Sequence, residues 1–157
     1  VVVRGNIAPL IELGAGFDLE LTARENIYLN GSLLGYTHEF IDQHLDDIIE
    51  FAELRDFMDM PLKNYSSGIA FAIATVTEPD VLIVDETLSV GDVFFQEKCE
   101  RRIQSFIDSG NVTVLFVSHS IDQVERLCKS CVWIEKGKQR MVGPVEEVCK
   151  AYRNQFN

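Results

Sequence analysis

The chain has 157 residues, 46% of them apolar, which is enough for one domain with a hydrophobic core or for a large piece of a bigger protein. Its 25 acidic and 14 basic residues give a net charge of −11, which disfavours nucleic acid as a partner because the phosphate backbone would be repelled. No apolar run approaches the roughly 20 residues that cross a bilayer, and the first residues do not resemble a signal peptide. We therefore expect a cytoplasmic protein that meets a membrane only through a partner.

Four cysteines are present, and two of them, Cys128 and Cys131, have the spacing of half a zinc site. The sequence contains no second paired motif, and its three histidines are scattered. We expect reduced, partly buried thiols without a metal or redox role.

The first half of the chain predicts short strands followed by helices. Residues 1–13 alternate loosely and predict one or two strands, and residues 12–17 form a glycine-rich stretch. Thr22 and Glu25 form a capping box that predicts a helix to about residue 34. Thr37 predicts the cap of a second helix, with apolar residues on one face and acidic residues on the other.

The central stretch of the chain is residues 81–86. Four apolar residues predict a strand buried on both faces, as in a parallel sheet, and the strand ends at Asp85 and Glu86. Because neighbouring side chains of a strand point in opposite directions, one carboxylate could hold a hydrated Mg²⁺ ion while the other orients a water molecule. Taken alone, the stretch favours a strand that simply ends at two solvated acids.

Polar motifs precede and follow this strand. Ser66, Ser67 and Gly68 open an apolar helix, where free amides would suit either an anion or a simple serine cap. Asp92 predicts the cap of a helix that ends at Gly110. His119 follows a second strand, 112–117, that is predicted to be buried.

The C-terminal part predicts a helix, a hairpin and a last helix. Ser120 and Gln123 form a second capping box, and residues 132–142 predict the hairpin. Pro144 fits the first position of the last helix, and Trp133 is expected to serve packing.

The order and spacing of these motifs resemble the nucleotide-binding domain of ABC-type ATPases. Residues 66–68 match the signature motif, Asp85 and Glu86 the Walker B strand with its glutamate, residues 89–92 the D-loop, and His119 the switch histidine. The amino-acid sequence of residues 10–17 and 21–26 is similar to that of the subfamily that exports O-antigen, capsule or teichoic-acid polymers.

The resemblance implies an α/β fold of the P-loop NTPase class, with a RecA-like, mostly parallel sheet and an inserted helical subdomain. Residues 1–20 would supply a sheet edge and the Q-loop region, and residues 21–64 the helical subdomain. Residues 65–157 would supply the signature helix and the Walker B, D-loop and H-loop half of the core. The domain would be truncated at its N-terminus.

The resemblance also implies a site for ATP and Mg²⁺. Asp85 would hold Mg²⁺ through water, Glu86 would orient the attacking water, and His119 would contact the γ-phosphate. Three small residues, Ser66, Ser67 and Gly68, would close over the ATP that is bound to the opposite subunit. Asp92 would couple the two sites across the dimer axis, and Glu12 stands where the family has its Q-loop glutamine.

The implied function is ATP hydrolysis that drives export of a polysaccharide or lipid-linked glycan. The implied partners are a membrane permease and a second ATPase subunit, and the implied location is the cytoplasmic face of the membrane. An ABC-type ATPase of DNA repair or translation is disfavoured by the acidic charge balance.

Two departures from the family pattern leave an alternative open. The phosphate-binding GxxxxGK[ST] loop is absent from these 157 residues, so the chain by itself is expected to be inactive. About four residues of the family pattern are also missing after Gly68, either from the protein or from the printed sequence. The alternative is a non-catalytic docking module that binds no nucleotide.

Overall fold

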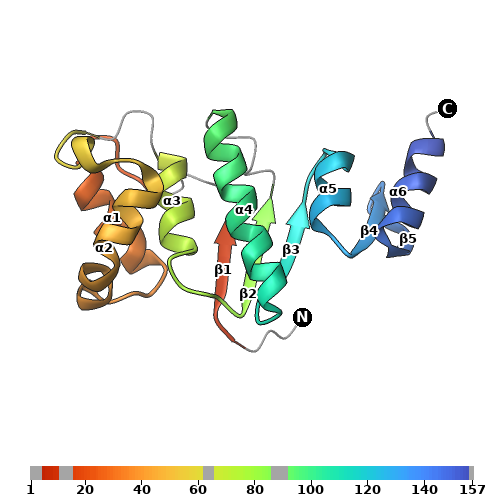
Figure 1. Cartoon of the computed structure of the whole chain (residues 1–157), viewed down its shortest axis with the longest axis horizontal. Coiled ribbons are helices and arrows are strands. Elements are labelled where there is room, and N and C mark those ends of the chain that lie inside the picture. The colour runs from red at the N-terminus through yellow and green to blue at the C-terminus, as the bar shows by residue number, and fades with distance from the viewer. Residues whose placement is uncertain (1–4, 11–15, 62–65, 86–91, 156–157) are drawn as a thin grey trace. The chain divides into compact units, whose positions relative to one another are not determined.

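The computed structural model describes residues 5–10, 16–61, 66–85 and 92–155, and Figure 1 shows the order of the elements. The chain forms two compact units, Val1–Leu115 and Phe116–Asn157, which are described separately. None of the helices in the described ranges has both the length and the apolar character needed to cross a bilayer.

The first unit contains a parallel strand pair that carries the central motif. β1 (Ile7–Leu10) pairs in parallel with β2 (Val81–Asp85), so that Ile7 lies opposite Val81. β3 (Thr113–Val117) follows β2 in the sheet. This arrangement confirms the predicted parallel pairing.

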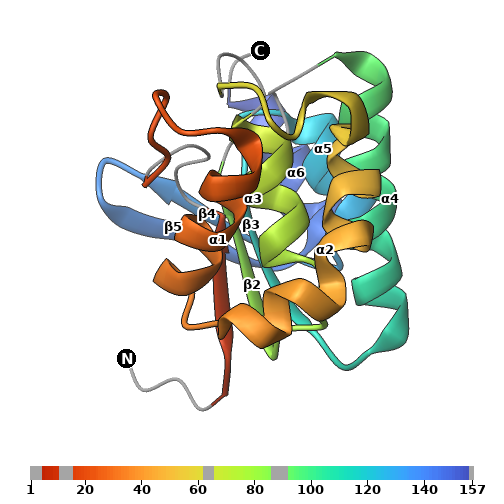
Figure 2. The ribbon, with the colours of Figure 1, turned by 90° about the vertical axis from the view of Figure 1, so that its left-hand side faces the viewer.

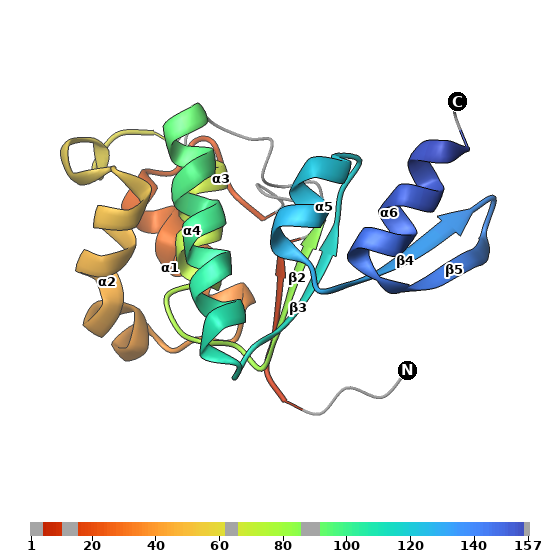
Figure 3. The ribbon, with the colours of Figure 1, turned by 45° about the vertical axis from the view of Figure 1, so that its right-hand side comes forward.

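β1 and β2 are fully buried on one face only. Leu82 and Val84 are 0% exposed, whereas Ile7, at 38%, is exposed on the alternate face of β1. The helices of the first unit lie on one side of the strands, which explains this alternation (Figure 3). On β3, Leu115 and Val117 are more than half exposed. The prediction that the strand at residues 81–84 is buried on both faces therefore holds for one face only, and the prediction of a buried strand at residues 112–117 is wrong for β3.

Two capped helices follow β1, as the sequence predicted. α1 (Ala23–Leu33) begins with a complete capping box, and the Thr22 N–H donates to the Glu25 carboxylate at 2.9 Å. This hydrogen bond lowers the pKa of Glu25 below its ordinary value. α2 (His38–Ala52) is capped by Thr37 and is followed by the short 3₁₀ helix η1 (Arg55–Phe57).

α3 (Ser66–Ala74) is the most deeply buried helix of the first unit, and it packs against α1 and α2 (Figure 2). Ile69, Phe71 and Ile73 are 0% exposed. α4 (Val93–Ser109) begins at its predicted cap, Asp92, and ends at Gly110, whose φ of 73° suits glycine.

The second unit consists of α5 (Ile121–Leu127), β4 (Ser130–Glu135), β5 (Lys138–Pro144) and α6 (Val145–Asn154). β4 and β5 form the predicted antiparallel hairpin, with α6 packed against it. Trp133 meets Tyr152 of α6 edge to face with ring centroids 5.4 Å apart, which supports a packing role.

Two predictions of helix starts in the second unit need correction. Pro144 is the N-cap of α6 and not its first helical residue, because its ψ of 139° is extended. Ser120 caps α5 as predicted, but the Ser118 hydroxyl donates to Gln123 Oε1 and accepts the Ser120 N–H. Ser118 thus makes the backbone contact that the capping box assigned to Gln123.

Candidate functional site

Asp85 is the last residue of β2, at the carboxyl end of a strand in a parallel pair. Ligands of open α/β sheets bind at such strand ends. Val84 is fully buried under the helices, and Asp85, half-buried, points the other way because side chains alternate along a strand. A carboxylate in this place suits a hydrated Mg²⁺ ion, which prefers oxygen ligands. Glu86 and Glu12 lie outside the described residues.

Ser66, Ser67 and Gly68 form the first turn of α3, as predicted. The first amides of a helix have no partner within the helix and carry the positive end of its dipole. This turn therefore has the backbone polarity that a phosphate group requires.

Gly68 also has a packing role that the sequence analysis missed. A Cβ at this position would lie 3.3 Å from Phe95 Cζ of α4 and 3.9 Å from the backbone oxygen of Ala52. Glycine thus allows α3 to approach the first turn of α4 closely. The sequence could have suggested this only through the small residue itself, because Phe95 is distant in the chain.

Asp92 caps α4, with its carboxylate accepting the Phe95 N–H at 2.9 Å. The capping prediction is confirmed. Residues 86–91, which include most of the predicted D-loop, lie outside the described residues. A coupling role for Asp92 therefore stays a prediction.

His119 lies in the second unit, in the bend between β3 and α5, and its side chain is exposed. Asp85 belongs to the first unit. Their approach to one phosphate group therefore stays a prediction.

Cys99 and Cys149 are buried, whereas Cys128 and Cys131 are half-buried. Burial raises the pKa of the Cys99 thiol to about 12, and burial together with neighbouring thiols raises the pKa of Cys128 and of Cys149. Because thiolate is the form that binds metals and attacks electrophiles, these three side chains are poorly suited to either task at neutral pH.

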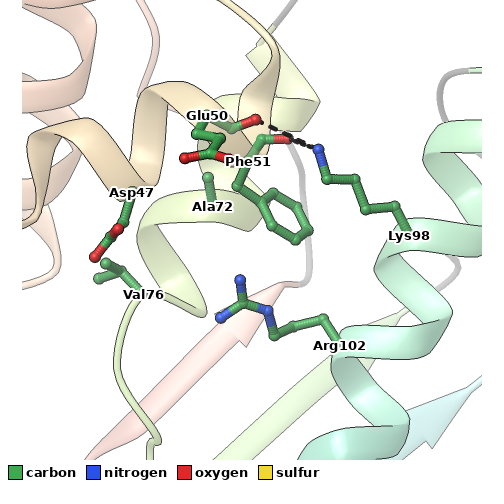
Figure 4. Close-up of a pocket in the computed structure, with 7 residues that line it drawn as sticks. All are labelled: Asp47, Glu50, Phe51, Ala72, Val76, Lys98 and Arg102. Carbon is green, nitrogen blue, oxygen red and sulfur yellow. Dashed lines mark hydrogen bonds between the residues drawn. The ribbon is translucent and has the colours of Figure 1, made fainter.

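A charged cluster that the sequence did not predict lies beside α3. Lys98 and Arg102 of α4 both approach the ring of Phe51 in α2, and together they border a pocket of about 440 Å³ (Figure 4). The available signal was two basic residues four positions apart on an otherwise amphipathic helix.

The amino-acid sequence was compared with those of known proteins. No protein-family model matches the chain. The chain is 46% identical over 157 residues to the O-antigen export system ATP-binding protein RfbB of Klebsiella pneumoniae, a match that covers 98% of this chain and 63% of that protein. It is 43% identical over 152 residues to the ABC transporter protein AbcA of Aeromonas salmonicida, a match that covers 94% of this chain and 49% of that protein. The chain is homologous to ABC-transporter ATP-binding proteins.

Two further comparisons agree with this ABC homology. The chain is 45% identical to the teichoic acids export ATP-binding protein TagH of Levilactobacillus brevis, a match that covers 98% of this chain and 43% of that protein. A solved structure, described as the ATP-binding subunit of an ABC transporter, superposes with a TM-score of 0.76 at 18% identity. That match covers 94% of this chain and 62% of the solved chain, and it confirms the predicted fold class.

The resemblance to ABC exporters of O-antigen and teichoic acid that the motifs indicated is likewise confirmed. The chain spans 63% of the length of the Klebsiella relative, so the similarity describes part of a larger ABC protein.

Proposed function

We propose that the chain forms part of the ATP-binding subunit of an ABC exporter that hydrolyses ATP to move a polysaccharide or lipid-linked glycan through a membrane permease. The observation that carries this proposal is 46% identity, over 98% of the chain, to a protein named for O-antigen export and ATP binding. The similarity to a teichoic-acid export protein supports the same class of cell-surface polymer.

In this proposal the hydrolytic groups are Asp85, Glu86 and His119. Asp85 would hold Mg²⁺ through water, Glu86 would orient the attacking water, and His119 would hydrogen-bond the γ-phosphate. Bound Mg²⁺ would neutralise charge that develops on the phosphates during transfer. The half-buried position of Asp85 at a parallel strand end supports its assigned role.

The second part of the site would come from another subunit of a homodimer. The first turn of α3, residues 66–68, would place its amides against the γ-phosphate of ATP bound to the partner. Asp92 would lie near the dimer axis, and Glu12 would take the place of the Q-loop glutamine. ATP would then join the two subunits, and hydrolysis would release them.

The remaining segments would connect ATP hydrolysis to transport. Residues 1–20 would form the sheet edge and Q-loop region, residues 21–64 the helical subdomain that receives the permease, and residues 65–157 the rest of the core. The protein would lie at the cytoplasmic face of the membrane. A docking module without nucleotide is not favoured, because two relatives at 46% identity are named as ATP-binding proteins.

The test is a Glu86→Gln variant of the full-length protein. We expect the rate of ATP hydrolysis to fall by about 100-fold or more, because the amide cannot accept a proton from the attacking water. Binding of Mg-ATP should be retained. Glu78→Gln is the matched control, since Glu78 is exposed and precedes β2 at its opposite end. A Glu86→Gln protein that hydrolyses ATP at the wild-type rate would refute the assignment.

A further inference from the structure

Lys98 and Arg102 lie four residues apart on α4 and therefore face the same side of this helix. The Lys98 ammonium group donates to the backbone oxygen of Phe51 at 2.9 Å and to the carboxylate of Glu53 at 2.8 Å. It also lies 3.4 Å from the backbone oxygen of Glu50. Lys98 thus meets the carbonyl end of α2, where the helix dipole is negative.

Arg102 makes the equivalent contact with α3. Its guanidinium group donates to the backbone oxygen of Thr75 at 3.3 Å, directly after the last residue of α3. Thr75 is buried, and its hydroxyl donates to the Phe71 oxygen at 2.7 Å. The two cations of α4 therefore satisfy carbonyl groups at the ends of two different helices.

The ring of Phe51 lies between these two contacts (Figure 4). Lys98 Nζ and Arg102 Cζ are each 4.9 Å from the ring centroid, within the range of cation–π attraction. Phe51 is only 7% exposed, and it stacks on Phe71 of α3 with centroids 5.5 Å apart. One aromatic ring thus joins α2, α3 and α4.

The same face of α4 reaches the start of α3. Phe95, one turn before Lys98, meets Phe51 edge to face, and its Cζ lies 3.3 Å from the position that a Cβ on Gly68 would take. Contacts along one side of α4 therefore run from the first turn of α3 to its carboxyl end. Hydrogen bonds to the carbonyl ends are directional, whereas the apolar contacts between these helices are not.

We propose that Lys98, Phe51 and Arg102 form a clamp that fixes α2 and α3 to α4 and so positions residues 66–68 for ATP bound to the opposite subunit. Lys98 and Arg102 act here as positioning residues and touch no substrate. The inference rests on the proposed ATPase function. The inference adds that Lys98 and Arg102 set the orientation of the first turn of α3, residues 66–68.

The clamp is tested with Lys98→Met and Arg102→Met in the full-length protein. Methionine keeps an unbranched apolar stem and removes the charge and the donors. We expect the double variant to raise the KM for ATP about three- to tenfold, while kcat stays within about twofold, because binding across the dimer weakens and the hydrolytic carboxylate is untouched. Lys98→Arg, which keeps a cation, should leave the KM near the wild-type value.

Arg101→Met is the matched control, because Arg101 is 72% exposed on the same helix and pairs with Glu97 of that helix. A double variant with the wild-type KM would overturn the clamp, and so would an equal rise in KM from Arg101→Met. If the double variant loses its helical circular dichroism, the two single variants are measured in its place, with the same direction expected.

A measurement independent of ATPase activity separates this proposal from the proposed function. Amide hydrogen exchange should be faster in the last turns of α2 and α3 in the double variant and unchanged there in Arg101→Met. If wild-type protein hydrolyses no ATP, the proposed function fails and exchange still decides whether the clamp holds the helices. If wild-type protein is active but the variants match it in both KM and exchange, the clamp alone fails.

Discussion

The two compact units differ in how much of their apolar surface is buried. In the first unit, α3 is enclosed by its neighbours, and three of its large apolar side chains are 0% exposed. In the second unit, the buried hydrophobic residues are few: Leu127, Val148 and Cys149. Its hairpin carries apolar side chains that are more than half exposed, namely Val132, Ile134 and Val142.

Surface ion pairs occur in both units, including the second. Arg153 of α6 pairs with Asp122 and Glu125 of α5, and Arg140 pairs with Glu135 across the hairpin. Exposed ion pairs contribute little to stability, whereas buried apolar area contributes in proportion to its size. Stability is therefore concentrated around α3, whose first turn is formed by residues 66–68.

The largest expected effect is in the first unit. Phe71→Ala should lower the free energy of unfolding by about 3–5 kcal/mol, because it leaves a cavity between α2 and α3. Denaturant titration of the full-length protein measures this change. Phe94→Ala is the control, since Phe94 is 81% exposed on α4, and it should change stability by less than about 0.5 kcal/mol. Equal losses from both variants would contradict a buried core around α3.

A smaller loss is expected from the second unit. Val148→Ala should cost about 2 kcal/mol, because Val148 is 1% exposed at the contact between α6 and the hairpin. Amide exchange should become faster in α6 and β5 and stay unchanged in α3. Val142→Thr, at a site that is 53% exposed, is the control with nearly the same shape. Faster exchange throughout α3 would show instead that the two units unfold together.

The smallest effect concerns the pH dependence of the second unit. Hydrogen bonds from Gln155 and Arg140 lower the pKa of Glu135 below its ordinary value of 4.5. Its contribution to stability is therefore complete above pH 4.5 and is lost as the pH falls through the lower, folded pKa. Glu135→Gln should remove this component from a series of thermal melts at decreasing pH. A series with the wild-type slope would show that Glu135 adds nothing to acid sensitivity.

Local signals in the sequence predicted the helix starts well. Thr22, Thr37 and Asp92 each cap the helix that they were predicted to cap, and Gly110 ends α4. A cap depends on a side chain and a backbone group within three residues, so the spacing alone contains the information. Pro144 shows the limit of such signals, because its ring suits either the cap or the first helical position.

The order of elements, the caps, and the series of motifs from Ser66 to His119 that resembles ABC ATPases could all be predicted from the sequence, because each signal depends on residues near one another in the chain. The three-dimensional packing was needed to learn which strand faces are covered, that Gly68 packs closely against Phe95, and that Lys98 and Arg102 meet the ends of α2 and α3. These features join residues that are tens of positions apart. Apolar attraction is not directional, so the sequence pattern shows that a face is buried but not which partner buries it.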